Sequence, residues 1–207
     1  MGEISLFESE EFNFIRSKAK EYNVEVRIRP LDEGIRGYKI DGEIVLNEYC
    51  YAERRNWTFC HELGHIILGH SSEPSDDEEK EADCFAAEIM MPEVDFIPDS
   101  RGVDLIELKR IYPHASWEAI ARRCLQFHEL IITIFDEGKV TFRSGSGNIN
   151  FPYVPLNEEI SMMEDSYKGK KSFGKIFGSF SIEAYFIDES KDILRVILVT
   201  QIEKDYN

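Results

Sequence analysis

The sequence predicts an α+β fold, in which a small antiparallel or mixed sheet precedes a pair of consecutive helices and strands dominate the last third. Two observations support this class. Strand-like and helix-like patterns occur in separate blocks, and the two strongest helical patterns follow each other directly. The chain has 207 residues, of which 43% are hydrophobic, so it can hold one full hydrophobic core and a smaller appended unit.

The first quarter of the chain should form a surface helix followed by a small sheet. Residues 9–22 begin with a serine that can cap a helix, carry acids in the first turn and repeat apolar side chains at helical spacing. The segment VEVRIRP alternates like a half-buried strand. RGYKIDGEIVLNE reads as two strands joined at the turn-forming pair Asp41 and Gly42.

The central part should be helical. A first helix is expected from about Ala52 to Gly69. Ser75 and Glu78 have the spacing of a capping box, in which each side chain accepts a hydrogen bond from the other residue's backbone N–H. A second helix should therefore begin there and end at Pro92, and two further short helices should follow.

The C-terminal part should consist mainly of strands. LIITIFDEGKVTFR predicts a hairpin around Glu137 and Gly138, and FSIEAYFIDESKDILRVILVTQIE predicts another. Between them lie a flexible Gly/Ser-rich stretch and a cationic loop. We therefore expect three regions: a core over residues 1–100, a helical segment over 101–129, and a β-rich region without an assigned role over 130–207.

Composition limits the partners and the compartment. With 40 acidic against 24 basic residues, the formal charge of −16 repels a phosphate backbone, so nucleic acid is not the expected partner. No apolar run approaches bilayer length and the acidic start lacks signal-peptide features, so we expect a cytoplasmic protein without membrane contact. The four cysteines include no Cys-x-x-Cys pair, which suits reduced thiols buried as small hydrophobic side chains. Nothing in the sequence indicates the oligomeric state.

The segment NWTFCHELGHIILGH carries the residues best suited to chemistry. His61 and His65 are four positions apart on the expected helix, so both imidazoles can point at one zinc ion. Glu62 lies about 100° round the helix from His61, where its carboxylate can act as a base toward water. His70 lies about 180° from His61 on the same projection, and we interpret it as a polar end of the helix.

A zinc site also needs a third protein ligand, and the second helix offers one. On a helical wheel, Glu79 and Asp83 fall on the apolar stripe that faces the core, whereas Glu81 and Glu88 fall opposite. Burying two acids would cost several kcal/mol unless they were paired or metal-bound. Glu79 is therefore the expected third ligand, and Asp83 the acceptor that holds a ligand imidazole in the correct tautomer. Three ligands leave one position open for water, as in catalytic zinc sites.

Some questions stay open from the residues alone. Two histidines on one helix face are common as surface or core groups, and acids after a cap can form a solvated first turn. Tyr112, His114 and Tyr153 lie in segments able to fold over the site and stabilise a tetrahedral oxyanion, but each is more often a packing or turn residue. The strand EIVLN could receive an extended peptide by edge pairing.

FCHELGHIILGH followed by EKEADCFAAEIMMP resembles the ImmA/IrrE metallopeptidases, in which a zinc helix precedes a Glu-x-x-Ala-Asn/Asp-x-Phe-Ala-Ala helix ending in Met-Pro. The resemblance is close over about residues 44–92 and weaker up to about Phe127. It implies that residues 1–100 form a gluzincin-like zinc metallopeptidase core. It implies that His61, His65 and Glu79 are the zinc ligands. It also implies that Glu62 is the general base.

The resemblance also implies a substrate class. In this family the substrate is a DNA-binding repressor, whose cleavage switches on mobile-element transfer or a stress response. We therefore expect a zinc-dependent endopeptidase with a narrow protein substrate. Asp83 departs from the family pattern, in which Asn is common at that position; an aspartate keeps the acceptor role but adds a charge.

Two hypotheses compete with this one. The helices DLIELKRIYP and SWEAIARRCLQF have helix-turn-helix spacing, which would suit a DNA-binding transcription regulator with a non-catalytic or structural zinc site. Against it, the turn carries Pro113, and the second helix begins without the basic or amide side chains that base readout needs, although Arg122 and Arg123 follow. In the other hypothesis zinc only holds two helices together, and Glu62 then has no chemical role.

Overall fold

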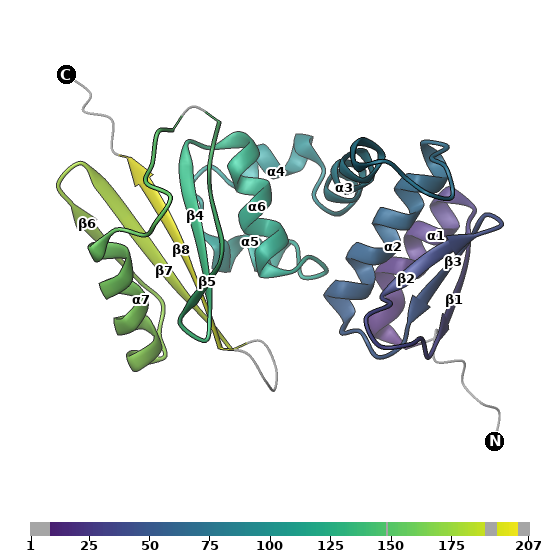
Figure 1. Ribbon diagram of the computed structural model, residues 1–207, viewed down its shortest axis with the longest axis horizontal. Coiled ribbons are helices and arrows are strands. Elements are labelled where there is room, and N and C mark those ends of the chain that lie inside the picture. The colour runs from purple at the N-terminus through teal and green to yellow at the C-terminus, as the bar shows by residue number, and fades with distance from the viewer. Residues whose placement is uncertain (1–8, 148, 189–193, 203–207) are drawn as a thin grey trace. The chain divides into compact units, whose positions relative to one another are not determined.

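The computed structural model describes residues 9–147, 149–188 and 194–202 (Figure 1). The chain divides into two compact units. The first contains the described residues up to Asp99 together with Lys109–Ser116, and the second contains the rest. The described residues include no helix long and apolar enough to cross a lipid bilayer. The predicted α+β class is confirmed, because both units combine helices with a sheet.

The first unit contains a three-stranded sheet. Its strands are β1 (Glu25–Arg29), β2 (Gly37–Ile40) and β3 (Glu43–Asn47), in the order β1-β3-β2. β3 pairs in parallel with β1 and antiparallel with β2. The predicted turn between β2 and β3 is present, since Asp41 and Gly42 both have positive φ angles, of 50° and 80°.

The position of β3 corrects one expectation about substrate binding. EIVLN is the central strand of this sheet and has a partner on each side, so it offers no free edge to a peptide. The strand beside the first long helix is β2, and its outer edge is unpaired within the three-stranded sheet. Sequence patterns give the strands but not their order, which is why the wrong strand was expected.

Four helices and a short 3-10 turn complete the first unit. They are η2 (Glu10–Phe12), α1 (Asn13–Tyr22), α2 (Ala52–Ile67), α3 (Asp76–Met90) and α4 (Glu93–Asp99). α2 packs against β2, β3, α1 and α3, and buries Phe59 and Leu63 completely. The predicted capping box opens α3: Ser75 Oγ accepts from Glu78 N, and the Glu78 carboxylate accepts from Ser75 N at 2.7 Å. α4 was not expected from the sequence, because Pro92 marks the end of the second predicted helix and the next predicted helix begins only at Asp104.

The second unit is built on a five-stranded antiparallel sheet. Its strands are β4 (Leu130–Asp136), β5 (Lys139–Gly145), β6 (Phe173–Phe177), β7 (Phe180–Asp188) and β8 (Leu194–Ile202), in the order β5-β4-β8-β7-β6. Both predicted hairpins are confirmed as antiparallel pairs, and the first turns at Glu137 and Gly138, which have positive φ angles. The connection between β7 and β8 includes residues outside the described part.

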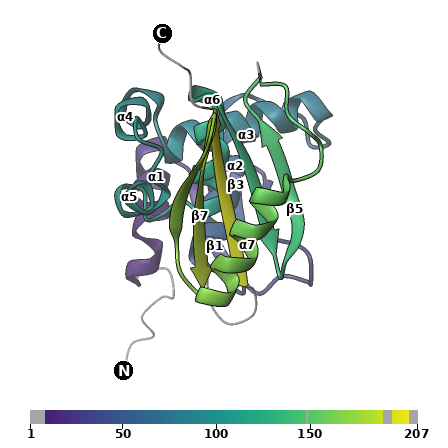
Figure 2. The ribbon, with the colours of Figure 1, turned by 90° about the vertical axis from the view of Figure 1, so that its left-hand side faces the viewer.

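Helices cover both faces of this sheet. α7 (Asn157–Gly169) lies across one face of the sheet (Figure 2). Its Met162 and Met163 are buried in the core with residues of β7 and β8. α6 (Trp117–Phe127) packs on β4 from the other face (Figure 1). Six of the seven residues of β4 are buried, as expected for a strand covered on both sides. α5 (Leu105–Ile111) contributes residues to both units.

Candidate metal centre

A glycine sets how closely the two helices of the site approach each other. A Cβ atom on Gly64 of α2 would lie 3.2 Å from Ala82 Cα and 3.3 Å from Ala82 O of α3. Carbon atoms pack best at about 3.5–4.0 Å, so only glycine lets α2 come this close to the α3 backbone. This contact sits beside His65 on α2 and between Glu79 and Asp83 on α3.

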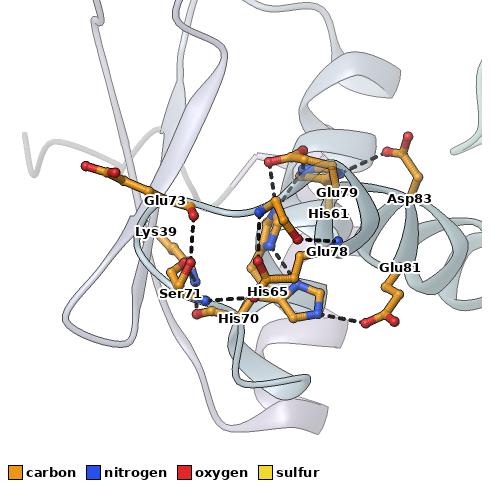
Figure 3. A network of polar contacts seen from close by, with 11 residues as sticks. Lys39, His61, His65, His70, Ser71, Glu73, Glu78, Glu79, Glu81 and Asp83 are labelled. Atoms are coloured by element: carbon orange, nitrogen blue, oxygen red, sulfur yellow. Dashed lines mark hydrogen bonds and ion pairs between the residues drawn. The ribbon is translucent and has the colours of Figure 1, made fainter.

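The imidazoles of α2 converge with one carboxylate of α3 (Figure 3). His61 Nε2 and His65 Nε2 are 3.0 Å apart. The Glu79 carboxylate lies 3.2 Å from His61 Nε2 and 3.7 Å from His65 Nε2. One ligand atom from each of these residues falls within 4.8 Å of the other two. Two imidazole nitrogens and one carboxylate oxygen are the donor set of a catalytic zinc site, so the residues present fit a divalent metal ion.

Asp83 contacts the ring nitrogen of His61 that faces away from this centre. Its carboxylate lies 2.9 Å from His61 Nδ1, which leaves Nε2 directed at Glu79. Burial lowers the pKa of His61, but the hydrogen bond and charge of Asp83, with the charges of Glu62 and Glu79, outweigh it and raise the pKa. The carboxylates around His61 therefore favour positive charge at this position, which a divalent cation would also satisfy.

The expected burial of the two acids was wrong. The side chains of Glu79 and Asp83 are 49% and 59% exposed. The buried stripe of α3 is formed by smaller and apolar side chains, namely Ala82, Ala86, Ala87 and Met90. The wheel gave the correct direction of both acids toward α2, but it could not show that they lie at the open margin of the contact, where water still reaches them.

Glu62 lies beside the centre and has a different environment. Burial raises its pKa, while the charge of His61 and a hydrogen bond from the backbone N–H of Lys39 partly offset that effect. Lys39 belongs to β2, so the carboxylate is held between α2 and the outer strand of the sheet. A carboxylate with a raised pKa is a stronger base than one in water, which suits general-base chemistry.

Sequence reasoning missed the contact between His70 and His65. The helix was expected to continue to about Gly69, but α2 ends two residues earlier, at Ile67. Gly69 adopts a positive φ angle of 73°, which turns the chain back. His70 Nδ1 thereby reaches within 2.9 Å of His65 Nδ1. The helical projection did not apply beyond Ile67, and the glycine directly before His70 was the one local signal that could have indicated this.

The metal centre opens into a cleft of about 400 Å³. Its walls are formed by Gly34–Gly37, which lead into β2, and by Trp57, Thr58, His61, Glu62, Glu79 and Asp83 from the two helices. The three candidates for oxyanion stabilisation do not line it. Tyr112 is buried and donates to Asp99 at 2.8 Å, His114 contacts the Met90 carbonyl, and Tyr153 lies in the second unit.

Comparison with known proteins identifies a family and a solved structure with a similar fold. The family described as the IrrE N-terminal-like domain matches residues 19–125, which include both helices of the centre. A solved structure from Mycobacterium tuberculosis, named a transcriptional regulator, has the same fold, with a TM-score of 0.66 and 13% sequence identity. The similarity covers 91% of this chain and 70% of that one. No curated protein matches the sequence.

Proposed function

The chain belongs to the IrrE N-terminal-like domain family of metallopeptidases, and on that premise we propose that it is a zinc-dependent endopeptidase. The observation that carries the proposal is the convergence of His61, His65 and Glu79. Of these, His61 and Glu79 line the cleft, together with Glu62. The fold of the first unit, with its sheet edge next to the helix that carries the histidines, supports a gluzincin-like core.

In this mechanism each residue has a separate task. His61, His65 and Glu79 hold the metal, which when bound supplies a Lewis acid and a lowered pKa for water. Glu62 takes a proton from the attacking water and passes it to the leaving amine of the cleaved peptide bond. Asp83 accepts the Nδ1–H of His61 and so fixes the imidazole with Nε2 free to bind the metal.

The substrate reaches the cleft as an extended segment in this proposal. The outer edge of β2 has no strand partner in the three-stranded sheet and runs beside Glu62, which accepts from the Lys39 N–H, so a peptide can add there as a further strand. The acids of the cleft and the net charge of −16 favour a basic partner. We propose a DNA-binding transcriptional repressor as the substrate, because such proteins are basic and the family resemblance implies this class.

Metal content and cleavage test the two parts of this proposal separately. Mass spectrometry of protein purified without a metal-affinity tag should find near-stoichiometric zinc in the wild type and in Glu62→Gln, and little in Glu79→Ala. Asp77→Ala is a matched control, because it removes an exposed acid from the first turn of the same helix. Loss of zinc in Glu62→Gln would contradict its role as a base that does not bind the metal.

Glu62→Gln also identifies the substrate. A variant that binds zinc and substrate but cannot remove the proton should retain the intact target protein, which wild-type enzyme should then cleave at one bond. We expect the target to be basic and to bind DNA. Cleavage of many unrelated proteins at similar rates would contradict a narrow substrate, and zinc binding without any cleavage would favour a structural metal.

A transcription regulator is the second candidate function. The solved structure with the same fold carries that name, and the present chain has the pair α5 and α6 at helix-turn-helix spacing. The arginines of α6 offer limited support, because Arg123 is 6% exposed and Arg122 pairs with Glu118 and lies over the Phe142 ring. Sequence-selective binding to a promoter fragment in a low-salt gel-shift assay would favour this function.

A further inference from the structure

We propose that His70 and Glu81 form a hydrogen-bonded relay that holds His65 in the tautomer that a metal ligand requires. The inference rests on the proposed zinc site and adds two positioning residues to it. His65 Nδ1 lies 2.9 Å from His70 Nδ1, and His70 Nε2 lies 3.2 Å from the Glu81 carboxylate (Figure 3). These contacts lie on the far side of His65 from Glu79.

The geometry determines where each proton sits. His65 binds a metal through Nε2 only if that nitrogen carries a lone pair, so the ring proton must be on Nδ1. The two Nδ1 atoms can share a hydrogen bond only if one of them lacks a proton, so His70 Nδ1 is the acceptor. The proton of neutral His70 is therefore on Nε2, where the Glu81 carboxylate accepts it.

Burial makes these hydrogen bonds selective. The side chains of His65 and His70 are 3% and 5% exposed, so water does not offer their ring nitrogens an easy alternative partner. Glu81 is largely exposed and supplies the negative end of the relay at the surface. A carboxylate that acts through an imidazole raises the electron density on the ligand nitrogen, as direct carboxylate contacts do at metal-bound histidines.

The loop that carries His70 is fixed from several sides. The backbone N–H of His70 donates to His65 O at 3.0 Å, and the carbonyl of His70 accepts from Lys39 Nζ at 2.7 Å. Lys39 also binds Ser71 O, and the Glu78 carboxylate accepts from Ser71 N at 3.2 Å. These contacts tie the loop to β2 and to the capping box of α3, and together they fix the position of His70.

The two imidazoles of the site are thus supported differently. Asp83 contacts His61 directly from α3, whereas Glu81 reaches His65 through His70. The helical wheel placed Glu81 away from the apolar stripe of α3, and from that position its carboxylate reaches His70. Both acids that follow Glu79 at short spacing then act on the same metal centre.

Zinc affinity of matched variants tests the relay. His70→Leu removes the acceptor, and His70→Asn has nearly the same shape but keeps an oxygen able to occupy the Nδ1 position. We expect His70→Leu to weaken zinc binding by about 10–100-fold and His70→Asn to recover most of that loss. Glu81→Gln should weaken binding by a few-fold, and Asp77→Asn, the same charge change on an exposed acid of α3, should have no effect.

Competition with a chromophoric chelator, using zinc alone as the probe, measures the zinc affinity of each variant. The thermal midpoint of the metal-free protein measures whether the variant is still stably folded. Long-range proton–nitrogen spectra of the zinc-loaded wild type should show His70 protonated at Nε2 and His65 at Nδ1. The spectra read the tautomers without any variant, so they test the relay even if His70→Leu fails to fold.

Three results would overturn the relay. They are wild-type zinc affinity in His70→Leu, equal losses in His70→Leu and His70→Asn, and a proton on His70 Nδ1 in the spectra. If one of these results is obtained but the wild type still binds zinc and cleaves its substrate, the relay is wrong and the proposed function stands. A wild type that binds no zinc would overturn both the proposed function and the relay.

Discussion

The contact between Gly64 and α3 links helix packing directly to the metal centre, and the substitution Gly64→Ala tests this link. The added Cβ would lie 3.2 Å from Ala82 Cα and 3.3 Å from both Ala82 O and Phe85 Cβ. None of these atoms can move by rotation of a side chain. Because carbon atoms prefer about 3.5–4.0 Å, α2 and α3 would have to separate locally by a few tenths of an ångström.

Two effects on stability oppose each other. Alanine is favoured over glycine inside a helix by about 1 kcal/mol, whereas overpacking a tight contact costs about 1–3 kcal/mol. The free energy of unfolding should therefore fall by about 0–2 kcal/mol. The effect on metal binding should be larger, because His65 and Glu79 lie on opposite sides of the contact and metal–ligand distances tolerate only about 0.2 Å. We expect zinc affinity to fall at least about tenfold.

Chelator competition measures the zinc affinity, and urea unfolding of the metal-free protein measures stability. Ala86→Gly is the control: it removes a buried methyl group from α3, so it should lower stability while leaving zinc affinity within about twofold of the wild type. If Gly64→Ala were more stable than the wild type and bound zinc equally well, the argument that this glycine sets the distance between the ligands would be wrong.

Three further predictions concern the rest of the chain. Glu159→Ala should cost about 3–5 kcal/mol in urea unfolding of the second unit, because it leaves the buried guanidinium of Arg143 without its carboxylate, and Glu158→Ala at the neighbouring position is the control. Burial raises the pKa of Asp136, but hydrogen bonds and the charge of Arg195 outweigh it and lower the pKa. The stability that this pair contributes is therefore complete above about pH 4 and is lost as the pH falls through the folded-state pKa of Asp136. Asp136→Asn should lower the stability at pH 7 and make the loss of stability in acid less steep. Urea unfolding midpoints at pH 7 and in acid measure both effects. Cys84 is exposed while two other thiols are buried with raised pKa values, so brief maleimide treatment followed by peptide mass spectrometry should find Cys84 modified first; equal labelling of the buried thiols would contradict their placement.

Features with local physical causes were predictable from the sequence. The capping box of Ser75 and Glu78 and the turn at Asp41 and Gly42 depend on residues a few positions apart, and the structure contains both. The spacing of the two histidines of α2 is equally local, because one helical turn brings them together. The expectation that all cysteines are buried failed at Cys84, since composition cannot show which face of a helix a residue occupies.

Features that depend on tertiary neighbours were not predictable in this way. β6 is an edge strand with mostly exposed residues, and it has a regular partner only in β7, so its pattern resembled a charged loop. α7 begins after a Pro-containing stretch, and its buried face is evident only once Met162 and Met163 are seen against the sheet. His70 follows the same rule, because its contact with His65 depends on where α2 stops and on how Gly69 turns the chain.

The exposure of Glu79 and Asp83 changes the physical reason for expecting a metal at this site. A desolvation penalty cannot be the reason, because about half of each side chain is in contact with water. The reason is the concentration of charge: three carboxylates, including Glu62, surround His61 and raise its pKa. Groups of like charge held this close by two helices repel one another, and a divalent cation bound by Glu79 and the imidazoles would remove that repulsion. The helix contact at Gly64 therefore holds these carboxylates close together, and metal binding there would couple the fold of this unit to its ligand.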